Sequence, residues 1–94
     1  MVSKTRPFDA ANYLADPLMQ AMYLSVAMEE GDAGDVAGAL GVVARARGMS
    51  SVARETGLGR ESLYKSLSEH GNPELATLLK VVRSLGLKLV AQPA

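Results

Sequence analysis

The sequence predicts one all-α domain of five helices, followed by a short C-terminal strand. Apolar residues make up 48% of the 94 residues, with much alanine and leucine, and most recur at helical spacing. Glycines and two Asx–Pro pairs divide the chain into segments of helix length. Because no linker, repeat or low-complexity segment interrupts it, residues 1–94 are expected to form a single small domain.

Residues 1–15 are expected to be an irregular arm, with Phe8, Tyr13 and Leu14 pinned against the body of the domain. Asp16–Pro17 then predicts a helix start, since aspartate accepts hydrogen bonds from free N–H groups and proline fits the first helical position. This first helix is expected over 17–30. Its broad apolar face favours a core position over a binding groove, and comprises Leu18, Met19, Met22, Tyr23, Val26 and Ala27.

The second helix is expected over 33–47, after a stop at Gly31 and a cap at Asp32. Its core residues recur at helical spacing: Val36, Ala37, Leu40, Val43 and Ala44. Three glycines weaken it by up to about 1 kcal/mol each relative to alanine. These glycines, which also leave room for another helix to approach closely, are Gly34, Gly38 and Gly41.

Residues 50–68 predict two short helices joined by a tight turn. Ala53 is small enough for the two helices to cross closely, and Gly57 accepts the positive φ that the turn requires. Leu58, Leu63 and Leu67 anchor the second helix. These offsets are typical of a helix-turn-helix, and the alternative is an ordinary helical hairpin with a glycine C-cap.

The fifth helix is expected to start at the cap Asn72–Pro73, to run to Leu85 and to end at Gly86. Its apolar stripe consists of Leu75, Leu78, Leu79, Val82 and Leu85. The alternating run after it predicts a strand, made of Leu87, Lys88, Leu89, Val90 and Ala91.

A lone strand needs a ladder partner from another molecule, and a second copy would give a homodimer. Two alternatives remain open. The tail adds to the sheet of a partner protein, or Leu87 and Leu89 merely cover the core.

Composition disfavours several function classes. The chain has no cysteine and a single histidine, His70, so no cofactor or metal site is expected. No nucleophile–base pair or phosphate-binding glycine loop is present, and catalysis is not expected. No apolar run reaches membrane-spanning length and the start lacks a signal-peptide core, which predicts a soluble cytoplasmic protein.

The net charge of zero conceals an acidic front and a basic back. Residues 1–44 carry two basic and six acidic side chains, and residues 45–94 carry eight basic and four acidic ones. This asymmetry suggests two partners of opposite charge, with phosphates at the basic half. The alternative is that both halves are simply solvated surface.

In a helix-turn-helix, the first residues of the second helix reach base edges in the major groove. Arg60 suits a guanine, and Glu61 either accepts from cytosine or orients Arg60. Tyr64 either contacts a phosphate or packs beside Leu67, and Asn72 either contacts a phosphate or caps the next helix. The candidate DNA-binding residues are Ser50, Ser51, Arg60, Glu61, Ser62, Tyr64, Lys65 and Asn72.

Several segments resemble the addiction-module antidote proteins of the HigA-like group. They are ALGVVARARGMSSVARETGL, GRESLYKSL and HGNPELATLLKVVRSLGLKL, with PFDAANYLAD and AMYLSVAMEEGD nearer the N-terminus, so the resemblance covers nearly the whole chain. It implies a lambda-repressor-like domain of the Xre/Cro type. It also implies a bacterial type II antitoxin that binds a RelE/HigB-like toxin and represses its own operon.

One departure concerns the Ser/Thr-Gln pair with which the broader Xre pattern begins its first motif helix, because Gly48–Met49 stands there instead. Ser50 or Ser51 is then left to make that phosphate contact. Such toxins are basic by the same resemblance, so the acidic front is expected to face the toxin through Asp16, Glu29, Glu30, Asp32 and Asp35. The alternative function is a stand-alone helix-turn-helix regulator without a toxin.

Overall fold

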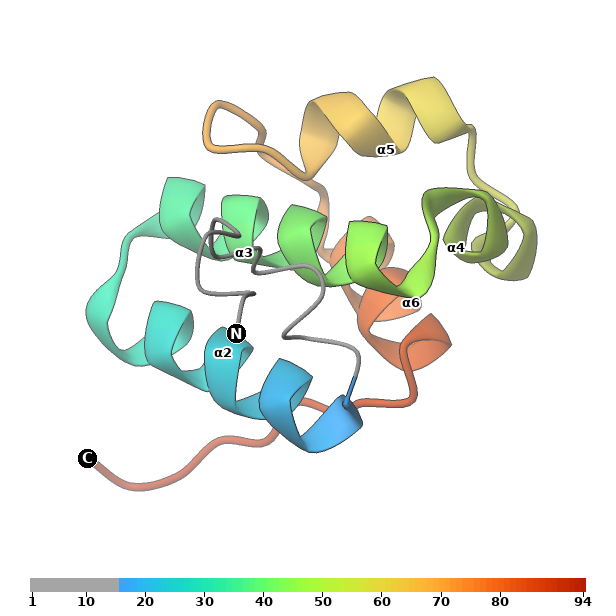
Figure 1. Cartoon of the computed structure of the whole chain (residues 1–94). Coiled ribbons are helices and arrows are strands. Elements are labelled where there is room, and N and C mark those ends of the chain that lie inside the picture. The colour runs from blue at the N-terminus through green and yellow to red at the C-terminus, as the bar shows by residue number, and fades with distance from the viewer. Residues whose placement is uncertain (1–15) are drawn as a thin grey trace, which may run out of the picture.

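The computed structural model describes residues 16–94, which form five helices (Figure 1). The helices are α2 (Pro17–Glu30), α3 (Ala33–Arg47), α4 (Met49–Thr56), α5 (Arg60–Ser66) and α6 (Leu75–Ser84). The all-helical prediction is therefore confirmed for this part of the chain. The expected arm, with Phe8, Tyr13 and Leu14, lies outside the described residues.

Aspartate caps fix the starts of the first two helices, as predicted. The Asp16 carboxylate accepts a hydrogen bond from the Leu18 backbone N–H at 3.2 Å, and Pro17 occupies the first helical position. Asp32 and Asp35 form a reciprocal capping box, in which each backbone N–H donates to the other's carboxylate at 2.9–3.0 Å. Both helices therefore begin at the positions that the sequence indicates.

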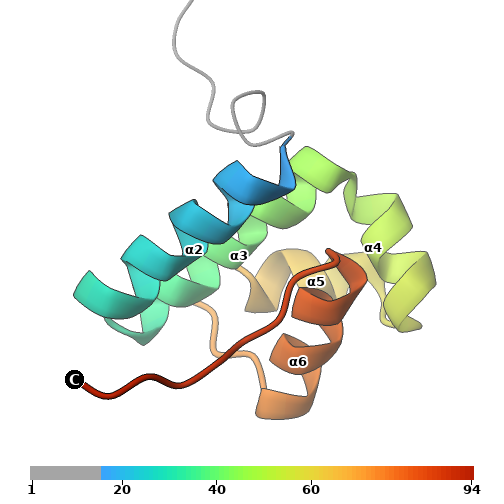
Figure 2. The ribbon, with the colours of Figure 1, turned by 90° about the horizontal axis from the view of Figure 1, so that it is seen from below.

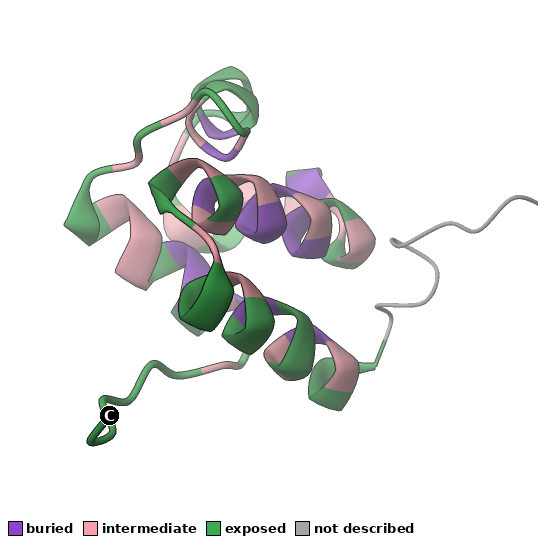
Figure 3. Cartoon of the chain, turned by 90° about the vertical axis from the view of Figure 1, so that its left-hand side faces the viewer, coloured by how far each residue is buried: buried purple, intermediate pink, exposed green. Residues whose placement is uncertain are grey.

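All five helices contribute to one apolar cluster, with α3 running through the middle of the molecule (Figures 1 and 2). Helix α3 contacts each of the other four helices. Buried positions gather on the sides of the helices that face one another (Figure 3). The largest fully buried side chains are Leu40, Leu63, Leu67, Leu85, Val43, Val52, Val81 and Val82.

The predicted core position of the apolar face of α2 holds only for its edge, where Met19 and Ala27 pack against the core. Leu18, Met22 and Val26 are 63%, 53% and 55% exposed, whereas Gln20 and Leu24 are buried on the inner side. Apolar residues cover most of the circumference of this helix, so periodicity alone does not select the side that packs on α3. We call Leu18, Met22 and Val26 the α2 stripe.

The predicted cap at Asn72–Pro73 is also wrong. Helix α6 begins at Leu75, its N-cap is Glu74, and Asn72 and Pro73 belong to the connection from α5. Proline fixes φ but not ψ, so Pro73 suits an extended connection as well as a helix start. Leu75, expected in the core stripe, is 70% exposed.

The predicted strand at residues 87–91 is also wrong, since these residues form no strand within the described chain. Gly86 ends α6 at φ 76°, and the Leu87 N–H donates to the Val82 carbonyl at 3.1 Å. Leu87 packs against the core, whereas Leu89 and Val90 are exposed. A strand needs a ladder partner, and no other described segment lies beside this one in strand conformation. The tail instead runs past α2 (Figure 2). Leu87 and Leu89 line one hollow together with Leu24 of that helix.

Candidate nucleic-acid interface

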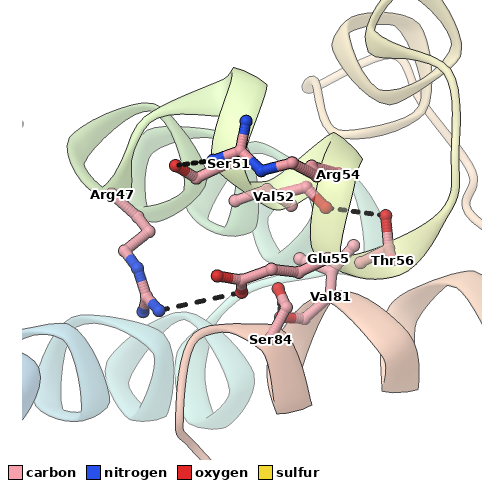
Figure 4. A network of polar contacts seen from close by, with 8 residues as sticks. All are labelled: Arg47, Ser51, Val52, Arg54, Glu55, Thr56, Val81 and Ser84. Atoms are coloured by element: carbon pink, nitrogen blue, oxygen red, sulfur yellow. Dashed lines mark hydrogen bonds and ion pairs between the residues drawn. The ribbon is translucent and has the colours of Figure 1, made fainter.

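Helices α4 and α5 are joined by the tight turn that the sequence predicts. Gly57 has φ 76°, and its N–H donates to the Ala53 carbonyl at 2.9 Å. The Thr56 hydroxyl donates to the Val52 carbonyl at 2.8 Å (Figure 4). It also accepts from the Leu58 N–H at 3.3 Å. A side chain at Gly57 would meet no atom within 4 Å, so this glycine is needed for its conformation and not for space.

Helix α5 is anchored by leucines and presents polar side chains to solvent. Leu63 and Leu67 are fully buried, and Leu58 packs against the same core. The prediction of these anchors is confirmed. The exposed residues of the helix are Arg60, Glu61, Ser62, Tyr64 and Lys65.

Tyr64 is 41% exposed, which is compatible with both predictions for it, a phosphate contact or half-buried packing beside Leu67. The Arg60 guanidinium lies 5.8 Å from the centroid of the Tyr64 ring, one helical turn away. This distance is within the range of a cation–π interaction. The two side chains therefore form one exposed pair at the start of α5.

The glycines of α3 receive the end of α5 and the turn after it. A Cβ built on Gly41 would collide with the Leu67 carbonyl oxygen, and one on Gly34 would lie 2.6 Å from the Glu69 carbonyl oxygen. At Gly38 the nearest atom is the Glu69 Cγ, at 3.3 Å. The close approach expected at these glycines exists, and it seats α5 on α3.

The first turn of α4 holds the two candidate serines. Its N-cap is Gly48, at φ 111°, which provides no side-chain cap. Ser50 is exposed, and the half-buried Ser51 accepts from an Arg54 Nη2 at 3.4 Å within the same helix (Figure 4).

An ion pair of 3.7 Å joins Arg47 of α3 to Glu55 of α4, and both side chains are partly exposed (Figure 4). A pair of this kind contributes no more than about 1 kcal/mol. It therefore supports the angle between α3 and α4 without holding them together.

Asn72 lies beside α5 despite its distance in sequence. It lines a shallow pocket together with Gly59 and Ser62 at the start of that helix. His70 is exposed in the connecting turn, as expected for a solvated residue. The structure thus brings Asn72 together with Ser62, one of the exposed residues of α5.

The acidic candidates lie at the ends of α2 and at the start of α3, and all of them are exposed: Asp16, Glu29, Glu30, Asp32 and Asp35. Three of these, Asp16, Asp32 and Asp35, also cap helices. Helix α2 and helix α5 lie on opposite sides of α3 (Figure 1). The acidic candidates on α2 therefore lie on the other side of α3 from the candidates on α5, whereas Asp32 and Asp35 belong to the start of α3 itself.

The α2 stripe is the surface feature that the sequence reasoning assigned wrongly. The sequence feature that could have revealed it is the apolar composition of α2. A helix that is apolar around most of its circumference and lies at the surface keeps an uncovered apolar face. Within residues 16–94 no cluster of three or more His, Asp or Glu side chains is placed to hold a metal ion. In the same residues no helix has the length and apolar character needed to cross a membrane.

Residues 4–93 match a family model described as "Probable addiction module antidote protein". The chain belongs to this family. A relative in Haemophilus influenzae, strain Rd, named only as an uncharacterized protein, is 40% identical over 92 residues, which are 98% of this chain and 95% of that protein. No solved structure matches the chain.

Proposed function

We propose that this antidote-family chain is the antitoxin of a type II toxin–antitoxin module. In this role it neutralises a RelE/HigB-like toxin and represses its own operon through a helix-turn-helix formed by α4 and α5. The observation that carries the proposal is the family match over residues 4–93. The glycine turn and the exposed polar face of α5 support the DNA-binding half. We also propose that the five helices form a lambda-repressor-like domain.

Helix α5 is the proposed recognition helix. Arg60, Ser62 and Lys65 are exposed at its start and middle, where a recognition helix contacts base edges. An arginine bidentate to guanine contributes about 1–3 kcal/mol of discrimination against the wrong base. Glu61 accepts from cytosine N4 or orients Arg60. Ser50, Ser51 and Asn72 are proposed to contact phosphates, since backbone contacts fix the register without reading sequence. Tyr64 is proposed to hold Arg60 in place through its ring.

We further infer a homodimer, since a two-fold axis would present two α5 helices to two half-sites of a palindromic operator. Residues 88–91 support the tail as its contact, because none of the described backbone–backbone hydrogen bonds involves them. Deleting 88–94 removes these groups and spares Leu87, which packs on the core. We expect the molar mass measured by light scattering to fall from that of a dimer to that of a monomer. A deletion variant that remains dimeric would place the contact elsewhere.

The DNA-binding half is tested by fluorescence anisotropy with the chain's own promoter and a random duplex of equal length. We expect salt-sensitive binding with clear preference for the promoter at physiological salt. Equal affinity for both duplexes would contradict the repressor function.

The toxin-binding half is tested by co-expression with the protein encoded by the adjacent reading frame. Rescue of growth and co-purification are expected. Promoter binding without either result would favour the alternative, a stand-alone helix-turn-helix regulator.

A further inference from the structure

We propose that the α2 stripe (Leu18, Met22 and Val26) is the surface that docks a partner protein, whose complementary surface is an apolar groove bordered by lysine or arginine. This inference rests on the proposed antitoxin function, in which the partner is the toxin. It assigns the centre of the contact to apolar residues and leaves the carboxylates at its border.

The α2 stripe is a continuous row of exposed apolar side chains. Leu18, Met22 and Val26 stand at i, i+4 and i+8, so they lie one above another on one face of α2. All three are more than half exposed. Single exposed apolar residues are normal in proteins, whereas contiguous apolar patches mark interaction sites. A helix that presents anchors at this spacing is recognised by an apolar groove.

The surface next to the stripe is concave. Val26 also lines a hollow of about 560 Å³ between α2, α3 and the turn after α5. Its apolar lining includes Tyr23, Ala39, Val42 and Leu67, and its charged lining consists of Asp35, Arg45 and Glu69. The exposed stripe therefore continues into a concave region that has an apolar wall and charged groups. A side chain of the partner can enter this hollow while α2 enters the partner's groove.

The charges at the ends of the stripe are acidic. Asp16 precedes the stripe and Glu29 and Glu30 follow it, and no lysine or arginine occurs between Asp16 and Ala44, although Arg45 lines the adjoining hollow. A second copy paired through α2 would bring carboxylates against carboxylates, in either the parallel or the antiparallel orientation. A partner with basic side chains at its rim would instead gain favourable contacts, which steer association. An apolar centre with a polar rim is the usual anatomy of an interface.

The position of the stripe keeps it away from α5. Helix α2 and helix α5 lie on opposite sides of α3 (Figure 1). A partner on the α2 stripe therefore leaves the exposed residues of α5 open to a duplex. This arrangement suits a chain that has two macromolecular partners.

The test replaces all three stripe residues with alanine in the full-length chain. The control is Leu75→Ala, which removes an apolar side chain that is 70% exposed on α6. The probe is the protein encoded by the reading frame adjacent to this gene, and Kd is measured by calorimetry. We expect about 100-fold weaker binding for the triple variant, because anchor residues carry most of the affinity, and less than about 3-fold for the control.

The other possible outcomes of this experiment can be told apart. A triple variant that folds by circular dichroism and binds as tightly as wild type overturns the docking surface and leaves the antitoxin function standing. A wild-type chain that does not bind the probe overturns both. A triple variant whose Tm falls well below that of Leu75→Ala shows that the stripe is covered within the chain. A change from dimer to monomer mass assigns the stripe to a second copy, and either result overturns the proposal.

Discussion

The side chains of Arg60 and Tyr64 illustrate how one residue prepares another for recognition. The guanidinium lies 5.8 Å from the ring centroid, and an exposed cation–π contact is worth about 0.5–1 kcal/mol. Holding Arg60 against the ring reduces the number of rotamers that it must lose when it contacts a base. Tyr64 is therefore a positioning residue for Arg60 in the proposed interface.

Substitutions at these two positions are expected to have graded effects on promoter binding. Arg60→Ala should lose about 1–3 kcal/mol of discrimination at one base pair in each half-site. Tyr64→Ala should lose about 0.5–1 kcal/mol, and Tyr64→Phe, which keeps the ring, should behave as wild type. Anisotropy titrations against the promoter and single-base variants measure all three. If Tyr64→Phe is as weak as Tyr64→Ala, the hydroxyl contacts a phosphate and the ring does not matter.

Lys65 provides the contrast within the same helix. Its exposed ammonium group is expected to meet a phosphate, which carries no sequence information. Lys65→Ala should weaken binding to the promoter and to a random duplex by the same factor, and should reduce the salt dependence of both. Titrations at two salt concentrations check this. A loss confined to the promoter would make Lys65 a base-reading residue.

Among the secondary-structure elements, α3 and α5 depend on each other through Gly41. A methyl group there would meet the Leu67 carbonyl oxygen, a backbone atom that cannot move without shifting the end of α5. At Gly38 the neighbour is the flexible side chain of Glu69, at 3.3 Å. The two glycines therefore differ in what opposes an added side chain.

This difference predicts opposite results for the same substitution. Gly38→Ala should be neutral or raise Tm, because alanine gains about 1 kcal/mol of helix propensity. Gly41→Ala should lower Tm by about 5 °C or more, since overpacking of about 1–3 kcal/mol or greater outweighs that gain. Thermal unfolding followed by circular dichroism compares the two variants. Equal Tm values would mean that α5 is not seated on α3 at Gly41.

The starts of α2 and α3 and the turn between α4 and α5 could be predicted from sequence because each depends on local chemistry, whereas the predicted cap of α6 at Asn72–Pro73 was wrong. Asp16, Asp32 and Gly57 act on backbone groups within a few residues, so their type and position suffice. The orientation of α2 could not be predicted, because its apolar residues occur on both faces and the face that is buried depends on the packing against α3. The prediction of a strand at 87–91 was wrong for a related reason, since ladder pairing depends on another segment.

At the scale of the whole molecule, the exposed face of α5 could be predicted better than the exposed face of α2. The exposed face of α5 follows from the anchors Leu63 and Leu67, which periodicity reveals. The charge division pointed to the front half as a second surface, and its carboxylates are exposed. The exposure of the α2 stripe was missed, because an apolar helical residue is assigned to the core unless the packing of its neighbours is known.

Toxin docking on α2 and DNA binding by α5 are expected to be independent, because α3 separates them (Figure 1). Effects at distant sites without shared partners are usually additive. The triple alanine variant of the α2 stripe should therefore bind the promoter duplex with wild-type affinity while losing the toxin. Arg60→Ala should show the reverse pattern, and wild type should form a complex that contains both partners.

Anisotropy with the labelled promoter and calorimetry with the protein of the adjacent reading frame measure the two affinities on each variant. Independence requires each variant to retain the binding that it was not designed to remove. A triple variant that folds and still loses the promoter would show that the two sides are coupled. The coupling would then have to pass through α3, which contacts both helices.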